Sequence, residues 1–545
     1  MNPHKSSARM SKNTKRAAAL AAAAAMVVVG VQAGSATAAP EKAQASSASA
    51  ATLRVGAIKS AQVNADSTAR SLGLGGAEKL VARDVIKDAD GTVHTRYERT
   101  YAGLPVLGGD LITHVAKTGK LKSVDKATDA KIAVASTTPK LKSAAGARKV
   151  IFAVSGKPVL AFETVKSSVK KDGTPSRVHT VTDATTGKQL YSYDEIDDGI
   201  KGGKAPKAPA KGGSGAGLEA GSGASMYSGA VPLTSTKGAS GFDLTDGERG
   251  GHKTYDLKGG QNGTGTLFTD ADDKWGNGKA DDPQTAAVDA AYGAAMTWDF
   301  YKNELGRNGI AGDGKAAYSR VHYGKAYVNA FWDDGCFCMT YGDGIGNTHP
   351  LTAIDVAGHE MSHGLTAATA NLEYAGESGG LNEATSDIFG TSVEFFAKNA
   401  TDVGDYLIGE KIDINGDGTP LRYMDKPSKD GQSLDYWDAN AGDVDVHYSS
   451  GIANHFFYLL AEGSGAKEIN GVKYDSPTKD GSKVTGIGQQ KAYKIWYKAL
   501  STYMTSTTDY KAAREATLKA ATDLHGADSA EAKAVAAAWA GVNVK

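Results

Sequence analysis

Residues 355–363 read Asp-Val-Ala-Gly-His-Glu-Met-Ser-His, within a pattern of helical period that covers residues 354–370. Four residues turn an α-helix by about 400°, so His359 and His363 project from one face and can share one metal ion. Glu360 lies about 100° further round, where a carboxylate can take a proton from metal-bound water. The stretch therefore predicts a helix that carries a zinc-type hydrolytic site.

The next helical pattern supplies the ligand that this site still needs. Zinc hydrolysis requires a third protein ligand and leaves the fourth position for water. Glu383 follows His363 with 19 residues between them, so a second helix packed beside the first completes a His₂Glu site. Asp387 lies one turn after Glu383, where a carboxylate can hydrogen-bond a ligand histidine and fix its tautomer. A metzincin is excluded, because positions 366 and 369 are threonines instead of Gly and His.

Further motifs in the same order resemble the thermolysin-like zinc metalloendopeptidases (peptidase family M4) over nearly all of residues 227–545. They are Asn329-Ala-Phe-Trp332, Tyr341-Gly-Asp-Gly344, Asn382-Glu-Ala-Thr-Ser-Asp-Ile-Phe-Gly390, Val446-His-Tyr-Ser-Ser-Gly-Ile452 and the C-terminal Gly541-Val-Asn-Val-Lys. The resemblance implies an α+β fold with two lobes, a β-rich N-lobe (residues 226–370, with the zinc-binding helix) and a helical C-lobe (residues 371–545). Zinc is expected in the cleft between them.

The resemblance also implies a role for each site residue. His359, His363 and Glu383 are expected to hold Zn²⁺, and Glu360 is expected to act as general base. The other implied residues are His447, assisted by Tyr374, at the oxyanion or leaving group; Asn382 and Asp387 behind the ligands; and Asn329, the Ala330 carbonyl and Arg422 on the peptide backbone. Apolar residues at the expected S1′ wall, namely Leu351, Val356, Ile408 and Leu421, favour cleavage before a bulky hydrophobic residue such as Leu or Phe.

Two departures from the family pattern leave points open. The family pairs the histidine at 447 with an aspartate five residues earlier, but position 442 is glycine, so Asp443 or Asp445 is the candidate partner. The family's double calcium site has a glutamate where this chain has Leu407, so one calcium ion is expected and the second is open. The carboxylates expected at this calcium site are Asp355, Glu394, Asp405 and Glu410. Asp270-Ala-Asp272 and Asp413–Gly418 are weaker candidates, since Asp/Gly turns without metal are common.

The segments before the metal motif indicate export and a removable module. Residues 1–39 have a basic start, an apolar run of about 15 residues and Ala36-Thr-Ala38 as a cleavage motif, the pattern of a secretory signal peptide. Residues 40–197 are expected to be a propeptide. Its residues 97–110 resemble the fungalysin/thermolysin propeptide motif (module about 53–125), and residues 140–195 resemble a PepSY module. Gly/Lys/Pro-rich residues 198–225 predict a flexible linker with the maturation site.

Composition limits the remaining possibilities. Lys and Arg number 61 and Asp and Glu number 61, so no basic surface favours nucleic acid as a partner. We expect a secreted monomer that acts on proteins and peptides, with its own propeptide as inhibitor and chaperone and no membrane anchor once the signal is removed. The two cysteines, Cys336 and Cys338, are expected either to form a C-x-C disulfide or to stay reduced. The alternative functions are an extracellular zinc- or calcium-binding protein with an inactive protease fold, and an N-terminal module that permanently binds substrate.

Overall fold

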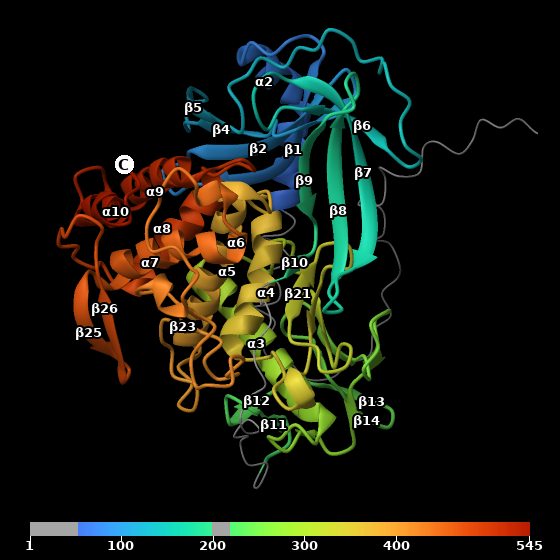
Figure 1. Ribbon diagram of the computed structural model, residues 1–545, viewed down its shortest axis with the longest axis vertical. Helices are drawn as coiled ribbons and strands as arrows, with labels where there is room; N and C mark the ends of the chain where they lie inside the picture. Colours follow the sequence, from blue (N-terminus) through green and yellow to red (C-terminus); the bar gives the residue numbers. More distant parts are fainter. Residues whose placement is uncertain (1–52, 199–217) are drawn as a thin grey trace, which may run out of the picture. The chain divides into compact units, whose positions relative to one another are not determined.

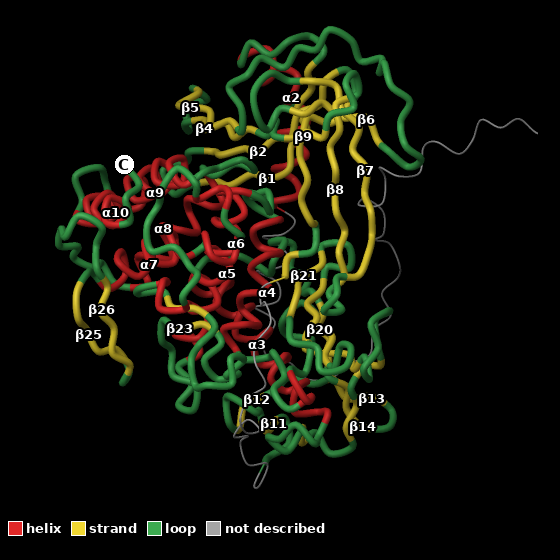
Figure 2. Tube along the Cα trace, in the orientation of Figure 1, coloured by secondary structure: helices red, strands yellow, loops and turns green. Residues whose placement is uncertain are grey.

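The computed structural model describes residues 53–198 and 218–545 (Figures 1 and 2). The expected signal peptide and the centre of the expected linker lie outside these residues. Among the described helices, none combines the length and the apolar character that a membrane span needs.

The N-terminal module (residues 53–198) is built on one nine-stranded sheet, with helix α2 (Ala65–Ser71) packed on β1. Its strands are β1 (Glu78–Lys87), β2 (Val93–Tyr101), β3 (Leu104–Leu107), β4 (Leu111–Val115), β5 (Leu121–Lys126), β6 (Arg148–Phe152), β7 (Val159–Val169), β8 (Pro175–Asp183) and β9 (Gln189–Asp194). The order is β5-β4-β2-β3-β6-β7-β8-β9, with β1 paired to β2. The parallel pair β3–β6 joins two halves that bury separate apolar clusters. The sequences of residues 95–106, 150–154, 158–165 and 177–183 each predict a strand, and the structure has strands in all four ranges.

The C-terminal module (residues 218–545) begins with small sheets and ends in helices, and Figure 2 shows this change from strands to helices. Its main sheet has the order β10-β21-β22-β20-β16-β15, with β17 paired to β16. Its strands are β11 (Ser222–Ala224), β12 (Ala230–Pro232), β13 (Thr236–Gly238), β14 (Gly241–Asp243), β15 (Thr245–Asp246), β16 (His252–Asp256), β17 (Thr266–Leu267), β18 (Thr269–Asp270), β19 (Lys274–Trp275), β20 (Tyr318–Val321), β21 (Ala330–Asp333), β22 (Cys338–Tyr341), β23 (Leu407–Ile408), β24 (Arg422–Tyr423), β25 (Gly465–Ile469) and β26 (Val472–Ser476). Strand β10 (Asp197–Asp198) comes from the end of the N-terminal module.

The helices follow the sequence periodicity closely. They are α3 (Pro283–Glu304), α4 (Ile354–Ala367), α5 (Gly376–Ala397), α6 (Val446–Ser449), α7 (Gly451–Glu462), α8 (Gln489–Thr502), α9 (Tyr510–His525) and α10 (Ala530–Gly541), with 3₁₀ turns η1 (Ile345–Asn347), η2 (Pro427–Asp430) and η3 (Ala441–Asp443). The predicted mixed α+β architecture, β-rich first and helical later, is confirmed.

Helix α4 is buried along almost its whole length because glycines let its neighbours approach closely. A Cβ at Gly358 would lie 3.0 Å from the Cα of Gly390 on α5, and one at Gly293 on α3 would lie 2.5 Å from the Cβ of Ala357. A Cβ at Gly364 would lie 2.5 Å from the indole of Trp332, so β21 also packs on α4. Figure 1 shows α4 and α5 side by side. This packing holds the histidine helix α4 against two helices, α3 and α5, and one strand, β21.

Two local predictions were wrong. The linker expected at residues 198–225 has paired strands at both of its described ends: Asp198 pairs with Phe331 in the main sheet, and residues 222–224 form β11, paired with β12 and β19. Gly223, one of the glycines that suggested flexibility, packs tightly, since a Cβ at this position would lie 2.6 Å from Val288. The sequence of residues 326–332 predicts one strand, but the strand begins only at Ala330, because Ala326 takes a left-handed conformation with φ of 48°.

Candidate metal centre and active site

Helices α4 and α5 bring the three predicted zinc ligands together. The Nε2 atoms of His359 and His363 lie 3.1 Å apart. The carboxylate of Glu383 lies 3.6 Å from His359 Nε2 through one oxygen and 3.5 Å from His363 Nε2 through the other. Each of the three residues is at most 2% exposed. The described residues thus contain a tight, dry triangle of ligand atoms.

Hydrogen bonds behind the ligands fix which ring nitrogens face the triangle. Asp387 Oδ1 accepts from His359 Nδ1 at 2.8 Å, and Asn382 Oδ1 accepts from His363 Nδ1 at 2.9 Å. Asn382 Nδ2 donates to the Leu372 carbonyl at 3.0 Å, so its oxygen is the atom that faces the histidine. Both Nδ1 atoms carry protons, and both Nε2 lone pairs therefore point at one another. Two facing lone pairs repel unless a cation lies between them.

The triangle has the dimensions of a zinc site. Ligand atoms about 2.0–2.1 Å from a tetrahedral zinc ion lie about 3.3–3.4 Å from one another. The three separations of 3.1, 3.5 and 3.6 Å bracket that value. Burial also lowers the pKa of His363 to about 4, which keeps its ring neutral, as a metal ligand must be. The residues present therefore fit Zn²⁺.

The predicted catalytic groups flank this triangle. Glu360 lies beside His359 on α4 and is fully buried. The Tyr374 hydroxyl donates to Glu383 Oε1 and lies 3.3 Å from His447 Nε2. His447 Nε2 is itself 3.8 Å from Glu383 Oε1. The structure thus brings Tyr374 and His447 to the carboxylate end of the triangle.

The carboxylate partner of His447 is Asp445. Its Oδ1 accepts from His447 Nδ1 at 2.7 Å and from the His447 backbone N–H at 3.2 Å, where it caps α6. Asp443 lies in η3 instead. Of the two candidates that the sequence left open, the structure therefore selects Asp445, two residues before His447.

Arg422 is held by Asp387, the same carboxylate that orients His359. Its Nε and Nη2 donate to the two Asp387 oxygens at 2.8 and 2.7 Å. A fourth donor, Asn454 Nδ2 on α7, reaches Asp387 Oδ2 at 2.8 Å. Burial alone would raise the pKa of Asp387, but the Arg422 guanidinium lowers it well below the ordinary value. No sequence signal identifies Asn454, because it is distant in the chain and belongs to no metal motif.

Asn329 and Ala330 lie where β21 begins, next to α4. Asn329 Oδ1 accepts from the Ala330 N–H at 2.9 Å. Asn329 Nδ2 approaches Thr174 Oγ1 at 3.4 Å, and the Tyr327 hydroxyl hydrogen-bonds the same threonine at 2.7 Å. Thr174 belongs to the β7–β8 turn of the N-terminal module and is fully buried. One of the predicted substrate-backbone residues, Asn329, thus contacts that turn.

The predicted S1′ residues are apolar and mostly buried, with Leu351, Val356 and Ile408 at most 2% exposed. Ile408 pairs with Arg422 between β23 and β24, and its carbonyl accepts from the Leu421 N–H at 2.8 Å. This arrangement places two of the four apolar residues next to Arg422.

A second group of carboxylates lies at the C-terminal end of α5. Oxygens of Glu394, Asp402 and Glu410 lie within 4.8 Å of one another. Glu394 Oε1 and both Glu410 oxygens accept no hydrogen bond among the described residues. Burial and the neighbouring carboxylates, Asp355 and Asp405 included, raise the pKa of both glutamates well above the usual range. The group fits Ca²⁺, an ion that prefers carboxylate oxygens.

The sequence predicted four of these five carboxylates and missed Asp402. Asp355 Oδ2 and Asp405 Oδ1 each accept a backbone N–H, from Gly409 at 2.6 Å and from Leu407 at 2.7 Å. The signal that could have identified Asp402 is its place in the same acidic loop, three residues before Asp405.

The two weaker calcium candidates are ordinary Asp turns. Asp270 Oδ1 accepts from the N–H groups of residues 272 and 273 at 2.8 and 2.9 Å. Asp413 Oδ1 accepts from the Gly418 N–H at 2.8 Å. Among the described residues, neither segment contributes to a group of three potential metal ligands.

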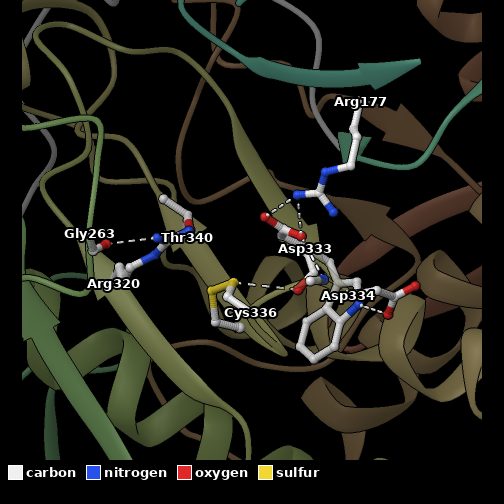
Figure 3. Close-up of a disulfide and its surroundings, with 10 residues drawn as sticks. Arg177, Gly263, Arg320, Asp333, Asp334, Cys336 and Thr340 are labelled. Atoms are coloured by element: carbon white, nitrogen blue, oxygen red, sulfur yellow. Dashed lines mark hydrogen bonds and ion pairs between the residues drawn. A yellow bond between two sulfur atoms is a disulfide. The ribbon is translucent and has the colours of Figure 1, made fainter. Parts of the chain in front are cut away.

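Cys336 and Cys338 form a disulfide across the turn between β21 and β22 (Figure 3). Cys336 Sγ also contacts the Asp333 carbonyl at 3.5 Å. Figure 3 shows Arg177, from β8 of the N-terminal module, reaching Asp333, whose two oxygens each lie 3.0 Å from Arg177 Nη2. The disulfide thus lies in the turn beside Asp333, which binds Arg177 of the N-terminal module.

Three family profiles match the chain. Residues 220–367 match the thermolysin metallopeptidase catalytic domain, residues 370–544 match the thermolysin metallopeptidase alpha-helical domain, and residues 78–128 match the fungalysin/thermolysin propeptide motif. Together they cover most of the described chain, in the order that the sequence resemblance predicts.

Individual relatives agree with the profiles. The transglutaminase-activating metalloprotease of Streptomyces mobaraensis is 57% identical over 508 residues, which are 89% of this chain and 64% of that protein. This chain therefore spans less than two thirds of that relative's length. Bacillolysin of Bacillus cereus is 35% identical over 86% of this chain and 84% of its own length, and thermolysin of Bacillus caldolyticus is 36% identical over 86% and 87%. The chain belongs to the thermolysin family of metallopeptidases.

Proposed function

We propose that the protein is a secreted, zinc-dependent neutral endopeptidase, made as a zymogen, that cuts peptide bonds before bulky hydrophobic residues. The observation that carries this proposal is the convergence of the His359 and His363 Nε2 atoms on the Glu383 carboxylate, with both Nδ1 protons already engaged. Without a cation between them, the facing Nε2 lone pairs repel each other. Membership of a metallopeptidase family supports peptide hydrolysis as the reaction.

Zinc, when held by these three residues, supplies a Lewis acid that polarises the scissile carbonyl and acidifies water. Glu360 takes the proton of the attacking water and passes it to the leaving amine. His447 and Tyr374 present donors at the carboxylate end of the triangle, where negative charge on the carbonyl oxygen needs stabilisation. Asp445 holds the His447 ring in place through Nδ1.

Substrate selection follows from the residues around Arg422. Its guanidinium is oriented by Asp387, and we expect it to contact a peptide carbonyl, with further backbone contacts from Asn329 and Ala330 at β21. Ile408 and Leu421 beside Arg422 form an apolar wall for the residue after the cut. We expect Leu or Phe at that position. The name of the 57% identical relative makes a transglutaminase the first protein substrate to test.

The N-terminal module acts as the prodomain, and its contacts support an inhibitory role. Thr174 covers Asn329, Arg177 bridges to Asp333, and β10 pairs with Phe331 and Trp332 along β21. A peptide substrate that needs the backbone of β21 competes with these contacts. The signal-like residues 1–39 support export, and the maturation cut is expected between β10 and β11, in the linker.

Calcium is proposed to stabilise the mature enzyme at the carboxylate group of Glu394, Asp402 and Glu410, with Asp355 and Asp405 close by. One bound ion neutralises carboxylates that otherwise repel one another in a buried place. We propose that the enzyme works as a monomer.

The test compares the processed wild-type protein with Glu360→Gln and with Glu248→Gln, the same chemical change at an exposed position. We expect Glu360→Gln to keep its zinc and to lose cleavage by at least about 10²-fold, while the control cuts normally. Mass spectrometry of a peptide library should place the cuts before Leu or Phe. A zinc-loaded wild type that cuts nothing would favour the alternative, an extracellular metal-binding protein with an inactive protease fold.

A further inference from the structure

A pair of buried histidines lies where the N-terminal module contacts α8 and α9. His94 on β2 and His114 on β4 are cross-strand partners, 3% and 2% exposed, with their Nδ1 atoms 2.6 Å apart. Asp88 Oδ2 lies 2.9 Å from His94 Nε2, and Asp125 Oδ2 lies 2.8 Å from His114 Nε2. Each ring is therefore held between a carboxylate and the other ring.

The same two carboxylates bind lysines of the C-terminal module. Lys498 on α8 donates to both oxygens of Asp88 at 2.6 and 2.7 Å, and Lys519 on α9 donates to Asp125. The ring of Tyr503, just after α8, stacks on His114 with centroids 5.1 Å apart. Any change of charge in the histidine pair thus acts directly on the ion pairs between the modules.

The charged and titratable groups around the pair come from both modules. From the N-terminal module they are Asp88, Arg96, Asp110 and Asp125, and from the C-terminal module they are Lys498, Tyr503, Lys519 and Asp523. Arg96 and Asp110 extend the contact through the Met504 carbonyl and Ser506. Burial alone would raise the pKa of Asp88, but the contacts with His94 and Lys498 lower it to about 2, so this carboxylate stays charged at any working pH.

The geometry fixes the number of protons on the pair. Each Nε2 faces a carboxylate and must carry a proton to donate to it. If both rings are neutral, both Nδ1 atoms are then bare and their lone pairs face each other at 2.6 Å. If both rings are charged, two N–H groups collide at the same distance. Only one proton, shared between the two Nδ1 atoms, satisfies every nitrogen.

We propose that the C-terminal module keeps the cut N-terminal module bound through this surface on α8 and α9, and that loss or gain of the one shared proton releases it. The inference rests on the proposed zymogen function and adds to it the partner that stays bound after maturation and the signal that removes it. The contact involves none of the predicted zinc ligands.

The proton count gives the expected pH dependence. Release admits water to both rings, and two hydrated histidines of pKa about 6.5 together carry about one proton at about pH 6.5. Above that pH the free pair carries fewer protons than the bound pair, and below it carries more. Binding is then strongest near pH 6.5, weaker by about threefold one pH unit away, and weaker by about 25-fold two units away.

One other group at the contact between the modules titrates in the same range. Burial raises the pKa of Glu373, which faces Tyr191 of the N-terminal module, to about 7, so it also gains a proton on binding. Its contribution is common to the wild type and to histidine variants. The ratio of their affinities therefore isolates the histidine pair.

The experiment uses the full chain with Glu360→Gln, which cannot process itself, and with a site for a sequence-specific protease inserted in the linker. After the cut, the dissociation constant of the two modules is measured by dilution and size-exclusion chromatography at pH 5.5, 6.5, 7.5 and 8.5. The same chain with His94→Gln and His114→Gln tests the pair, and His525→Gln, at the exposed end of α9, is the matched control. If the double variant fails to fold, His114→Gln alone removes the shared proton.

We expect the affinity ratio of wild type to variant to peak near pH 6.5 and to fall by about 25-fold at pH 8.5, with the control following the wild type. A ratio that stays constant within about twofold from pH 5.5 to 8.5 would overturn the proposal. Because the chain is catalytically silent, this result is independent of the protease assay. If the affinity ratio depends on pH as expected but the processed enzyme cuts no peptide, the proposed function is refuted and the role of the histidine pair is not.

Discussion

Replacing Asp387 by asparagine is expected to weaken zinc binding and to destabilise the fold by separable amounts. The carboxylate accepts four hydrogen bonds of 2.7–2.8 Å, one from His359, two from Arg422 and one from Asn454. An amide presents one oxygen and one NH₂, so the donors that meet the NH₂ lose their acceptor. The lost support for His359 should lower zinc affinity by about 10–100-fold. The buried Arg422 left without its partner should cost about 3–5 kcal/mol.

Two assays separate these effects. Competition with a zinc chelator gives the zinc dissociation constant, and denaturant unfolding of the zinc-free protein gives the free energy of unfolding. Asp425→Asn is the matched control, because Asp425 is also fully buried but binds Lys429 and the Asp475 backbone. It should lose stability and keep its zinc affinity. A folded Asp387→Asn protein with wild-type zinc affinity would show that Asp387 does not support His359 as a zinc ligand.

Three further predictions address other parts of the account. Asp445→Asn should lower kcat by about tenfold or more with little change in KM, whereas Asp443→Asn should leave both unchanged, and steady-state kinetics on one peptide decides between them. Calcium chelation should lower the Tm of the wild type, and Glu410→Gln should reduce the loss, since it removes one of the repelling charges; an unchanged Tm would argue against a calcium site. Burial alone would lower the pKa of His179, but its two glutamate partners raise it to about 9. This stabilisation is complete below about pH 6.5 and is lost as pH rises through 9, so the Tm difference between wild-type zymogen and His179→Gln should shrink from pH 7 to pH 10.

The sequence predicted the helices, and the convergence of His359, His363 and Glu383, because both follow from local spacing. A period of 3.6 residues defines α4 and α5, and the four-residue spacing of His359 and His363 fixes their common face. Glu383 follows from a single further requirement, that a second helix packs on the first. These inferences need no long-range information.

The remaining features depend on contacts between distant segments. Asn454 completes the Asp387 network from a helix that carries no motif, and Asp402 joins the acidic group through the path of a loop. Composition also gave a wrong prediction at β11. Ser222-Gly-Ala suggests flexibility, but Gly223 packs so closely on the side chain of Val288 that no Cβ fits there. The choice between Asp443 and Asp445 depended on the turn that begins α6, which spacing alone does not define.

One zinc ion on His359, His363 and Glu383 is expected to enable peptide hydrolysis. The most direct measurement removes all metal from the processed enzyme, restores calcium, and then titrates zinc while peptide cleavage is followed. We predict activity that rises linearly and saturates at one zinc per chain, and no recovery in His363→Ala. Full activity in the zinc-free protein, or full recovery in His363→Ala, would contradict the account.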